Sequence, residues 1–338
     1  MDCPKISVIV PVYNTGELLK ETVARIQRQT LKDFELLLVD DGSAETTSAI
    51  CDSLAEQDSR IRVIHKQNGG ICSARNVGIA QAHGDYIAFC DHDDNMYSDC
   101  LQKALEAALK YEADVVRYRR AYSVLTEQHE KSTNHMKPFE SEFFSQINWD
   151  NYIKIIRSCG YGVWAGIVKK SFVQQHSIAF DESVKYGYED HIFTARCLVN
   201  ASKVYILNEE LYEWMQRIST STSCKMSDSI LENRLYAIKK WCEQERILQS
   251  KYLVPNATKN YRNIDYLNFG ACEIRNNTKN LARQKNLFKE LKNLLGIQNG
   301  PISGQASLKK RIVWMVYCNN WMEILALKDS LTKITKKG

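Results

Sequence analysis

Strand-like and helix-like segments alternate over the first 120 residues, and this alternation constrains the fold more than any other feature of the chain. The strand-like segments are residues 6–12, 34–39, 61–65, 86–90 and 114–118, and the helix-like segments are residues 17–29, 46–57, 71–82 and 98–111. The first strand is almost entirely apolar or β-branched, as strands covered on both faces are. The order predicts an α/β fold with a mostly parallel central sheet, right-handed crossovers and flanking helices.

An acidic run directly follows the strand at residues 86–90. It consists of Asp91, His92, Asp93 and Asp94. Neighbouring carboxylates repel one another and are costly to desolvate, so such a group at the end of a buried strand needs a counter-charge. A divalent cation shared with substrate phosphates supplies one, and the run therefore indicates a metal–phosphate site. The alternative is an acidic surface turn.

Residues suited to binding a nucleotide also follow the first two strands. Pro11, Tyr13 and Asn14 end the first strand, and Asp40 ends the second. Because ligands of parallel sheets bind outside the carboxyl ends of the strands, we expect these residues beside the acidic run. Tyr13 offers a flat face for stacking on a base, and Asp40 accepts a hydrogen bond from an imide N–H or a sugar hydroxyl. The alternative for residues 40–43 is a tight turn with a helix cap.

The common glycine-rich phosphate motifs, GxGxxG and GxxxxGK followed by Ser or Thr, are absent after the first strand. Their absence argues against dinucleotide binding and against a P-loop ATPase. The phosphates must then be held by a metal and basic side chains. Arg75 is a candidate, because arginine pairs bidentately with phosphate and helix N-termini favour anions. An ordinary structural ion pair is the alternative for this arginine.

Charge and cysteine usage narrow the class of protein further. A net charge of +5 over 338 residues does not indicate a nucleic-acid-binding protein. The eleven cysteines contain no CxxC pair, which favours reduced thiols and a cytoplasmic location. No segment of the sequence reaches the length of a transmembrane helix.

Four motifs over the first 120 residues together resemble the family 2 glycosyltransferases. They are SVIVPVYN at residues 7–14, VDDGS at 39–43, ARN at 74–76 followed by Gly78, and GDY at 84–86 leading to DHDD at 91–94. Their order and spacing match the family, and the combination is far more specific than any one motif. The resemblance implies the GT-A fold, a nucleotide-diphosphate sugar donor with UDP as the expected nucleotide, and a divalent metal, Mn²⁺ or Mg²⁺.

The resemblance also assigns residues to the donor. The donor-binding set would be Pro11, Tyr13, Asn14, Asp40, Arg75, Asp91, Asp93 and Arg217. The metal would be held among Asp91, Asp93 and Asp94, and which of them touches it stays open. Residues 212–221 resemble the family's Tyr-x-Tyr-Arg-x-x-x-x-Ser segment, and its Arg217 would reach the diphosphate when a loop closes.

The second part of the family pattern implies an acceptor side with a general base. Residues 162–170 resemble the family's tryptophan-containing strand, although an Ala-Gly pair replaces the more usual Lys-Leu after Trp164. The resemblance points to Asp190 as the base that deprotonates the acceptor hydroxyl, with Glu189 as the second choice. Helix capping is the alternative for this acidic pair. Trp164 and Trp214 are candidates for stacking on acceptor sugars, with aromatic core filling as the alternative.

The chain changes character after residue 222. We expect a GT-A domain over residues 1–222, divided into a donor half (1–120) and an acceptor half (121–222), and a helical region over 223–338. The basic and then apolar stretch at 309–317 predicts either an interfacial helix on an anionic membrane or a helix packed on the body or on a second subunit. We therefore expect peripheral contact with the inner face of the cell membrane or a homodimer.

Taken with the family resemblance, the residues predict a metal-dependent inverting glycosyltransferase. Its acceptor would be a glycan or a lipid-linked sugar in the synthesis of a bacterial surface polysaccharide. The alternative is a non-catalytic nucleotide-sugar-binding protein of the same fold, against which the complete set of acidic residues argues.

Overall fold

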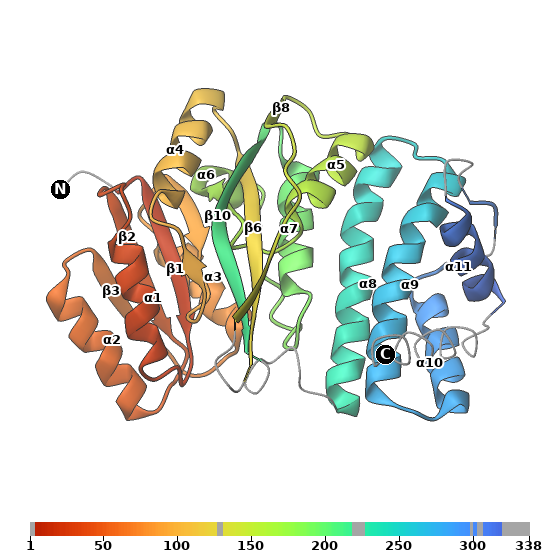
Figure 1. Cartoon of the computed structure of the whole chain (residues 1–338), viewed down its shortest axis with the longest axis horizontal. Coiled ribbons are helices and arrows are strands. Elements are labelled where there is room, and N and C mark those ends of the chain that lie inside the picture. Colours follow the sequence, from red (N-terminus) through yellow and green to blue (C-terminus); the bar gives the residue numbers. More distant parts are fainter. Residues whose placement is uncertain (1–3, 127–130, 218–226, 298–299, 303–306, 320–338) are drawn as a thin grey trace. The chain divides into compact units, whose positions relative to one another are not determined.

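The computed structural model describes residues 4–126, 131–217, 227–297, 300–302 and 307–319 (Figure 1). The chain divides into two compact units, Met1–Cys224 and Lys225–Gly338. The boundary expected between residues 222 and 223 lies outside the described residues.

One sheet organises the described residues of the first unit. Its strands are β1 (Ile6–Val12), β2 (Phe34–Asp40), β3 (Ile61–His65), β4 (Tyr86–Phe89), β5 (Asn95–Met96), β6 (Val115–Leu125), β7 (Lys131–His135), β8 (Glu142–Phe144), β9 (Gly166–Lys169) and β10 (Val204–Arg217). The order across the sheet is β3-β2-β1-β4-β9-β6-β10-β5, with β7 paired to β6 and β8 paired to β10. The prediction of an α/β fold with a central sheet is therefore confirmed, while the strand pairings are mixed, four being parallel and five antiparallel.

The parallel half of the sheet comes from the segments that the sequence marks as strands. β1 pairs in parallel with β2 and β4, and β2 pairs in parallel with β3. Both β1 and β2 are buried along their whole length, which explains their continuous apolar character. Gly78 lies in helix α3 (Ile71–Gln81) and allows this helix to approach β1 closely, because a Cβ at this position would lie 2.4 Å from Cγ2 of Ile9.

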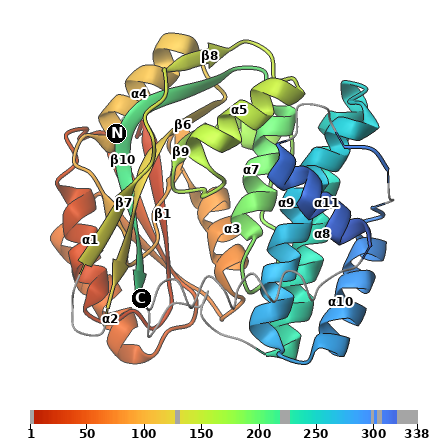
Figure 2. The same cartoon turned by 45° about the vertical axis from the view of Figure 1, so that its right-hand side comes forward.

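The other half of the sheet is mixed. β9 lies antiparallel between β4 and β6, while β10 returns parallel to β6. The register of this last pair shifts twice, between Leu207 and Glu210 and between Glu210 and Tyr212. Figure 2 shows the long, bent course of β10 along this side of the sheet. The irregularity redirects the side chains of its second half, as bulges do.

Helices flank the sheet of the first unit, as predicted. They are α1 (Leu18–Gln27), α2 (Glu45–Gln57), α3 (Ile71–Gln81), α4 (Cys100–Tyr111), α5 (Trp149–Cys159), α6 (Lys170–Gln175) and α7 (Glu189–Asn200). Each crossover helix lies within a few residues of the range that periodicity predicts. The parallel connections therefore follow the strand–helix–strand rule.

The second unit is helical, and this expectation too is confirmed. Its helices are α8 (Asp228–Lys251), α9 (Asn256–Asn277), α10 (Leu281–Leu294) and α11 (Leu308–Cys318). Glu245 of α8 is fully buried and accepts hydrogen bonds from Trp241 and Arg262, at 2.9 Å and 2.7 Å. This buried ion pair fixes how α8 and α9 pack, because either partner alone would be a costly buried charge.

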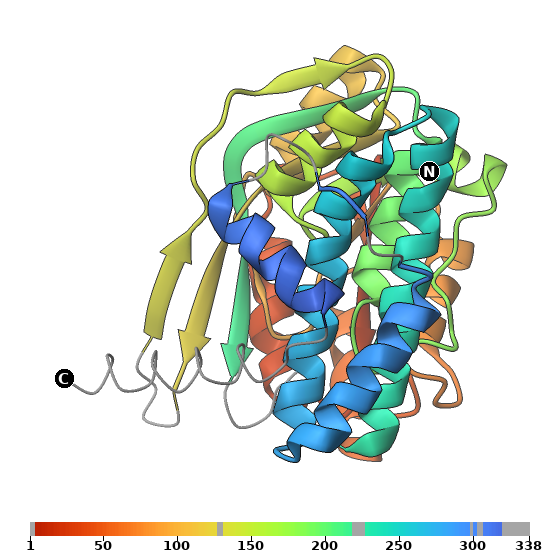
Figure 3. The same ribbon diagram turned by 90° about the vertical axis from the view of Figure 1, so that its right-hand side faces the viewer.

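Helix α11 contains the basic and apolar tail segment. Figure 3 shows it running across the other helices of its unit. Trp314 and Tyr317 are buried, and the Trp314 indole donates to the Gly300 carbonyl (2.9 Å), whereas Ile312 and Met315 are exposed. The buried residues agree with a packed helix, and membrane contact stays a prediction. No helix in the described part of the chain is long and apolar enough to span a membrane.

Candidate active site

The ends of β1, β2 and β4 lie at one edge of the sheet, as the parallel topology requires. The Asp41 N–H donates to the Val12 carbonyl (2.9 Å), and the Asn14 side chain accepts from the Ala44 N–H (2.8 Å). These bonds connect the end of β1 to the loop that follows β2. The residues expected to surround the base of the nucleotide therefore come together at this edge.

Asp40 is held by protein donors at this edge and is only 2% exposed. It accepts hydrogen bonds from the Ser43 N–H (3.0 Å), the Ser48 hydroxyl (2.6 Å) and the His65 ring (2.8 Å). Burial alone would raise the pKa of Asp40, but these bonds outweigh it and lower the pKa. Asp40 is therefore an ionised anchor of the loop after β2.

Tyr13 has the opposite environment. The Tyr13 side chain is 53% exposed. Pro11 is buried within β1, and Asn14 turns the chain with a φ of 51°. Tyr13 is thus presented to solvent by a rigid strand end, where a base can stack on it.

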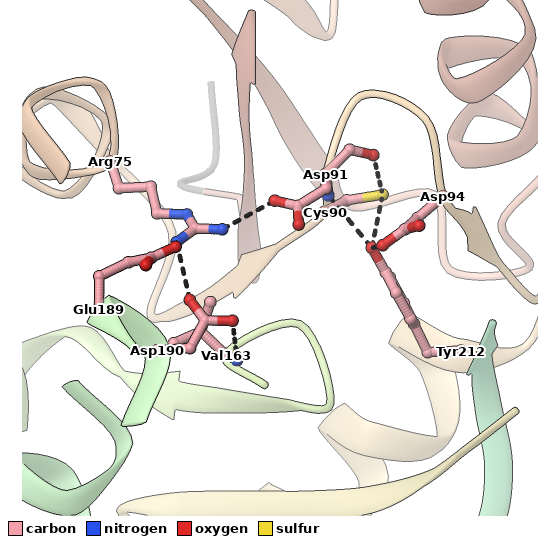
Figure 4. A network of polar contacts seen from close by, with 8 residues as sticks. All are labelled: Arg75, Cys90, Asp91, Asp94, Val163, Glu189, Asp190 and Tyr212. Carbon is pink, nitrogen blue, oxygen red and sulfur yellow. Dashed lines mark hydrogen bonds and ion pairs between the residues drawn. The ribbon is translucent and has the colours of Figure 1, made fainter. Parts of the chain in front are cut away.

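The three carboxylates of the acidic run face different partners. Asp94 is fully buried, and its two oxygens accept from the Tyr212 hydroxyl (2.8 Å) and the Met215 N–H (2.7 Å). The same hydroxyl accepts from the Asp91 N–H (3.1 Å). Tyr212 therefore fixes the loop of the acidic run from β10, as Figure 4 shows.

Asp93 pairs with the arginine at the end of β10. Its Oδ2 accepts from Arg217 at 2.6 Å, and its carbonyl accepts from the same nitrogen at 3.0 Å. Burial raises the pKa of Asp93, and the Asp91 carboxylate adds to the rise, whereas Arg217 opposes it. The family segment continues through Ser221, which lies outside the described residues.

Repulsion within the acidic run is strong. Burial raises the pKa of Asp94 well above its ordinary value, and the charges of Asp91 and Asp93 raise it further. Among the described residues, no group of three or more His, Cys, Asp or Glu side chains is arranged to hold a metal ion. The acidic run therefore has the hard oxygen donors of a Mg²⁺ or Mn²⁺ site, but they do not converge on one point.

Arg75 links the acidic run to the predicted base. Its guanidinium donates to Asp91 (2.8 Å), Asp190 (2.8 Å) and Glu189 (3.3 Å), and its side chain is 1% exposed (Figure 4). Burial alone would lower the pKa of Arg75, but the three carboxylates outweigh it and raise the pKa. The structure thus places Arg75 among carboxylates, the arrangement of the ion-pair alternative, and phosphate binding by this residue stays a prediction.

Asp190 has the electrostatics of a general base. Burial raises its pKa to about 7, and the charges of Glu189 and Asp91 contribute to the rise, while Arg75 and the Val163 N–H oppose it. Asp190 lies in the first turn of α7, where the N-cap is Tyr188 and no side chain caps the helix. The carboxylate accepts from Arg75 and from the Val163 N–H (3.4 Å). The side chain is thus turned toward the acidic run rather than onto the helix end.

The two tryptophans expected near the acceptor form a stack with neighbouring aromatic rings. Trp164 is 5% exposed, and its ring stacks on Tyr212 at a centroid distance of 4.8 Å. Trp214 is half-buried, stacks on Tyr122 at 4.9 Å and lies 6.3 Å from Trp164. Core packing accounts for Trp164 on its own, while contact of either ring with a sugar stays a prediction.

Two features of the site have no counterpart in the motif-based prediction. Tyr212 organises the acidic run, although the sequence marks it only as part of the segment before Arg217. The buried strand β6 also contains three arginines within four residues, Arg117, Arg119 and Arg120. These arginines could have been found from the sequence, because charged residues are rare inside an otherwise apolar strand.

Comparison with known proteins identifies the class. Residues 7–172 match the model described as Glycosyl transferase family 2. One curated relative is the uncharacterized glycosyltransferase EpsJ of Bacillus subtilis, which is 33% identical over 65% of this chain and 63% of that protein. Another is the glycosyltransferase GlyG of Streptococcus pneumoniae, which is 44% identical over 33% of this chain and 37% of that protein. The chain thus spans less than two thirds of the length of these relatives.

The solved structures agree on the fold. The complex of S. aureus TarS residues 1–349 with UDP-GlcNAc superposes with a TM-score of 0.60 at 19% identity, covering 96% of this chain and 92% of that one. Residues 7–172 thus match the family 2 glycosyltransferases, and the fold is the GT-A fold of TarS.

Proposed function

We propose that the protein transfers a sugar from a UDP-sugar to a hydroxyl of a glycan or lipid-linked acceptor, with inversion at the anomeric carbon, in the synthesis of a bacterial surface polysaccharide. The observation that carries this proposal is the buried contact of Arg75 with both Asp91 and Asp190. This contact connects the edge expected to bind the donor to a carboxylate with the pKa of a base. The family match and the UDP-GlcNAc complex of TarS support the choice of donor.

The proposed base has a defined task. The Asp190 carboxylate accepts the proton of the acceptor hydroxyl while the hydroxyl oxygen attacks the anomeric carbon. The bond between that carbon and the diphosphate oxygen breaks on the opposite face, and UDP leaves with the electron pair. A pKa of about 7 suits this step, because the group is ionised near neutral pH and still basic enough to take the proton.

The residues at the strand ends would bind the donor. The exposed Tyr13 ring would stack on the base, and Asp40 would keep the loop beneath it in place. The carboxylates of Asp91 and Asp93 fit a divalent cation as hard oxygen donors, and their mutual repulsion favours one. Such a cation would neutralise charge on the departing diphosphate.

A donor panel tests the proposal. The full chain is incubated with a set of nucleotide sugars, with Mn²⁺ or Mg²⁺ present, and release of nucleotide diphosphate is measured. We expect release from UDP-sugars and a large loss in Asp93→Ala. Binding of a nucleotide sugar without any turnover would favour the non-catalytic alternative, and no binding at all would refute both.

A further inference from the structure

Strand β6 brings two arginines into the interior beside the proposed base. Arg117 is 3% exposed, and Arg120 is half-buried. Both lie within electrostatic reach of Asp190, and neither forms an ion pair with a carboxylate of the described residues. A buried cation next to a half-buried one, with no carboxylate paired to either, is unfavourable, and proteins seldom keep such an arrangement without a use for it.

The two guanidiniums differ in what they contact. Arg117 donates to the carbonyls of Gly160 (3.1 Å) and Gly162 (2.8 Å) and so holds the turn before Trp164. Gly166 leaves room for the Arg117 stem, because a Cβ there would lie 3.0 Å from its Cδ. Arg117 is therefore a structural part of this corner, even though its charge stays uncompensated.

Some N–H donors of Arg120 have no hydrogen-bond partner among the described residues. Its Nη1 contacts the weak acceptor Sδ of Met136 at 3.2 Å, and its guanidinium lies over the Trp164 ring at 5.2 Å. Its Nε is buried without a partner, and its Nη2 makes no hydrogen bond to the described residues yet is not buried. Burial and the charge of Arg117 both lower the pKa of Arg120.

We propose that Arg120 forms an anion subsite that binds a phosphate group of the acceptor. The proposal deepens the proposed function and rests on it. The two guanidinium charges match the roughly two negative charges of a phosphate monoester or diphosphate better than the single charge of a carboxylate. The half-buried Trp214, which stacks beside Trp164, would cover the neighbouring sugar ring. The acceptor is therefore a phosphate-bearing sugar or glycan.

Phosphate binding to the donor-saturated protein is the direct test. The full chain is saturated with UDP, so that the diphosphate site is filled, and inorganic phosphate is titrated calorimetrically. We expect phosphate to bind, and Arg120→Gln to weaken it about tenfold or more, because a charge-assisted hydrogen bond is lost. Arg119→Gln is the matched control, since Arg119 is already partnered by Asn208 (3.0 Å) and Glu210 (3.5 Å).

A second set of variants tests the site while Arg120 itself stays in place. Met136→Glu places a carboxylate beside Arg120 from a partly exposed position, and should abolish phosphate binding, whereas Met136→Ala should leave it. Equal phosphate affinity in wild type, Arg120→Gln and Met136→Glu would overturn the subsite. UDP affinity is measured on the same samples, so a failure of donor binding, which refutes the proposed function, is separate from a failure of this site.

The source of the phosphate is distinguished by two arms. In the first, transfer to a sugar phosphate is compared with transfer to the same sugar without phosphate, and we expect Arg120→Gln to remove the preference. In the second, sedimentation with phosphatidylglycerol vesicles is compared with phosphatidylcholine vesicles. Loss of vesicle binding in Arg120→Gln, with no change in the sugar preference, would assign the site to lipid headgroups and overturn an acceptor subsite.

Discussion

Arg75 offers one positive charge to three carboxylates, and this imbalance governs the chemistry of the site. One cation cannot neutralise Asp91, Glu189 and Asp190 together, so repulsion among the three carboxylates favours a retained proton. Burial is the main cause that raises the pKa of Asp190 to about 7, and the charges of Glu189 and Asp91 add to the rise while Arg75 opposes it. Burial and the neighbouring charges together therefore set the basicity of the proposed base.

The pH dependence of turnover should report this pKa. Because Asp190 must be ionised to accept a proton, activity should fall as the pH drops through about 7. Glu189→Gln removes a charge that raises the pKa of Asp190, so its acidic limb should move to lower pH. The measurement is kcat/KM against pH in both proteins, and an unmoved or oppositely moved limb in Glu189→Gln would contradict the assignment.

Removing the positive charge of Arg75 should have a large effect on the free energy of unfolding. In Arg75→Gln three partly buried carboxylates lose their counter-ion, and we expect a loss of about 3–5 kcal/mol in the free energy of unfolding near neutral pH. The loss should shrink in acid, where the carboxylates take up protons. Urea unfolding at both conditions measures it. Lys20→Gln is the control, since its pair with Glu17 is largely exposed and its loss should change stability by less than about 1 kcal/mol.

At the level of elements, the close approach of α3 to β1 positions Arg75. Gly78 lies one turn after Arg75 on the same helix, and its Cα faces Ile9 of β1. This contact sets the depth at which the helix lies against the sheet. Arg75 is consequently buried rather than exposed at the helix start.

Gly78→Ala tests that contact. A Cβ 2.4 Å from Cγ2 of Ile9 forces the helix outward or the isoleucine off its rotamer, so we expect a loss of about 1–3 kcal/mol in unfolding free energy. Ala80→Ser, on an exposed position of α3, should change stability by less than about 0.5 kcal/mol. A Gly78→Ala protein as stable as wild type would show that the helix has room to move.

The elements also show what the sequence could predict. β1, β2 and β4 follow from continuous apolar runs, and their shared edge follows from parallel pairing. The antiparallel insertion of β9 between β4 and β6 does not, because a four-residue strand carries no mark of its partners. The pairing of Arg75 with Asp190 joins residues 115 positions apart, so a local pattern cannot predict it.

Asp94 illustrates the same limit. The sequence places three carboxylates together, and the family pattern makes each of them a candidate metal ligand. Burial of Asp94 under Tyr212 arises only when β10 crosses the acidic run. Its role is therefore decided by tertiary structure, and the metal assignment stays a proposal for Asp91 and Asp93.

At the scale of the whole molecule, donor binding should stabilise the GT-A unit. A ligand that binds the folded state alone raises the melting temperature by mass action. We expect UDP with Mn²⁺ to raise Tm more than UDP with EDTA, and Asp93→Ala to lose the metal-dependent part. Differential scanning fluorimetry measures this, and equal shifts with Mn²⁺ and EDTA would argue against a metal in donor binding.

The central claim is that Asp190 activates the acceptor while a separate group of residues holds the donor. Its most direct test is UDP affinity and sugar-transfer rate, measured side by side in wild type and Asp190→Asn. We predict a UDP dissociation constant within about threefold of wild type, and a transfer rate lower by about 10²–10⁴-fold. An Asp190→Asn protein that transfers sugar at the wild-type rate would contradict the account.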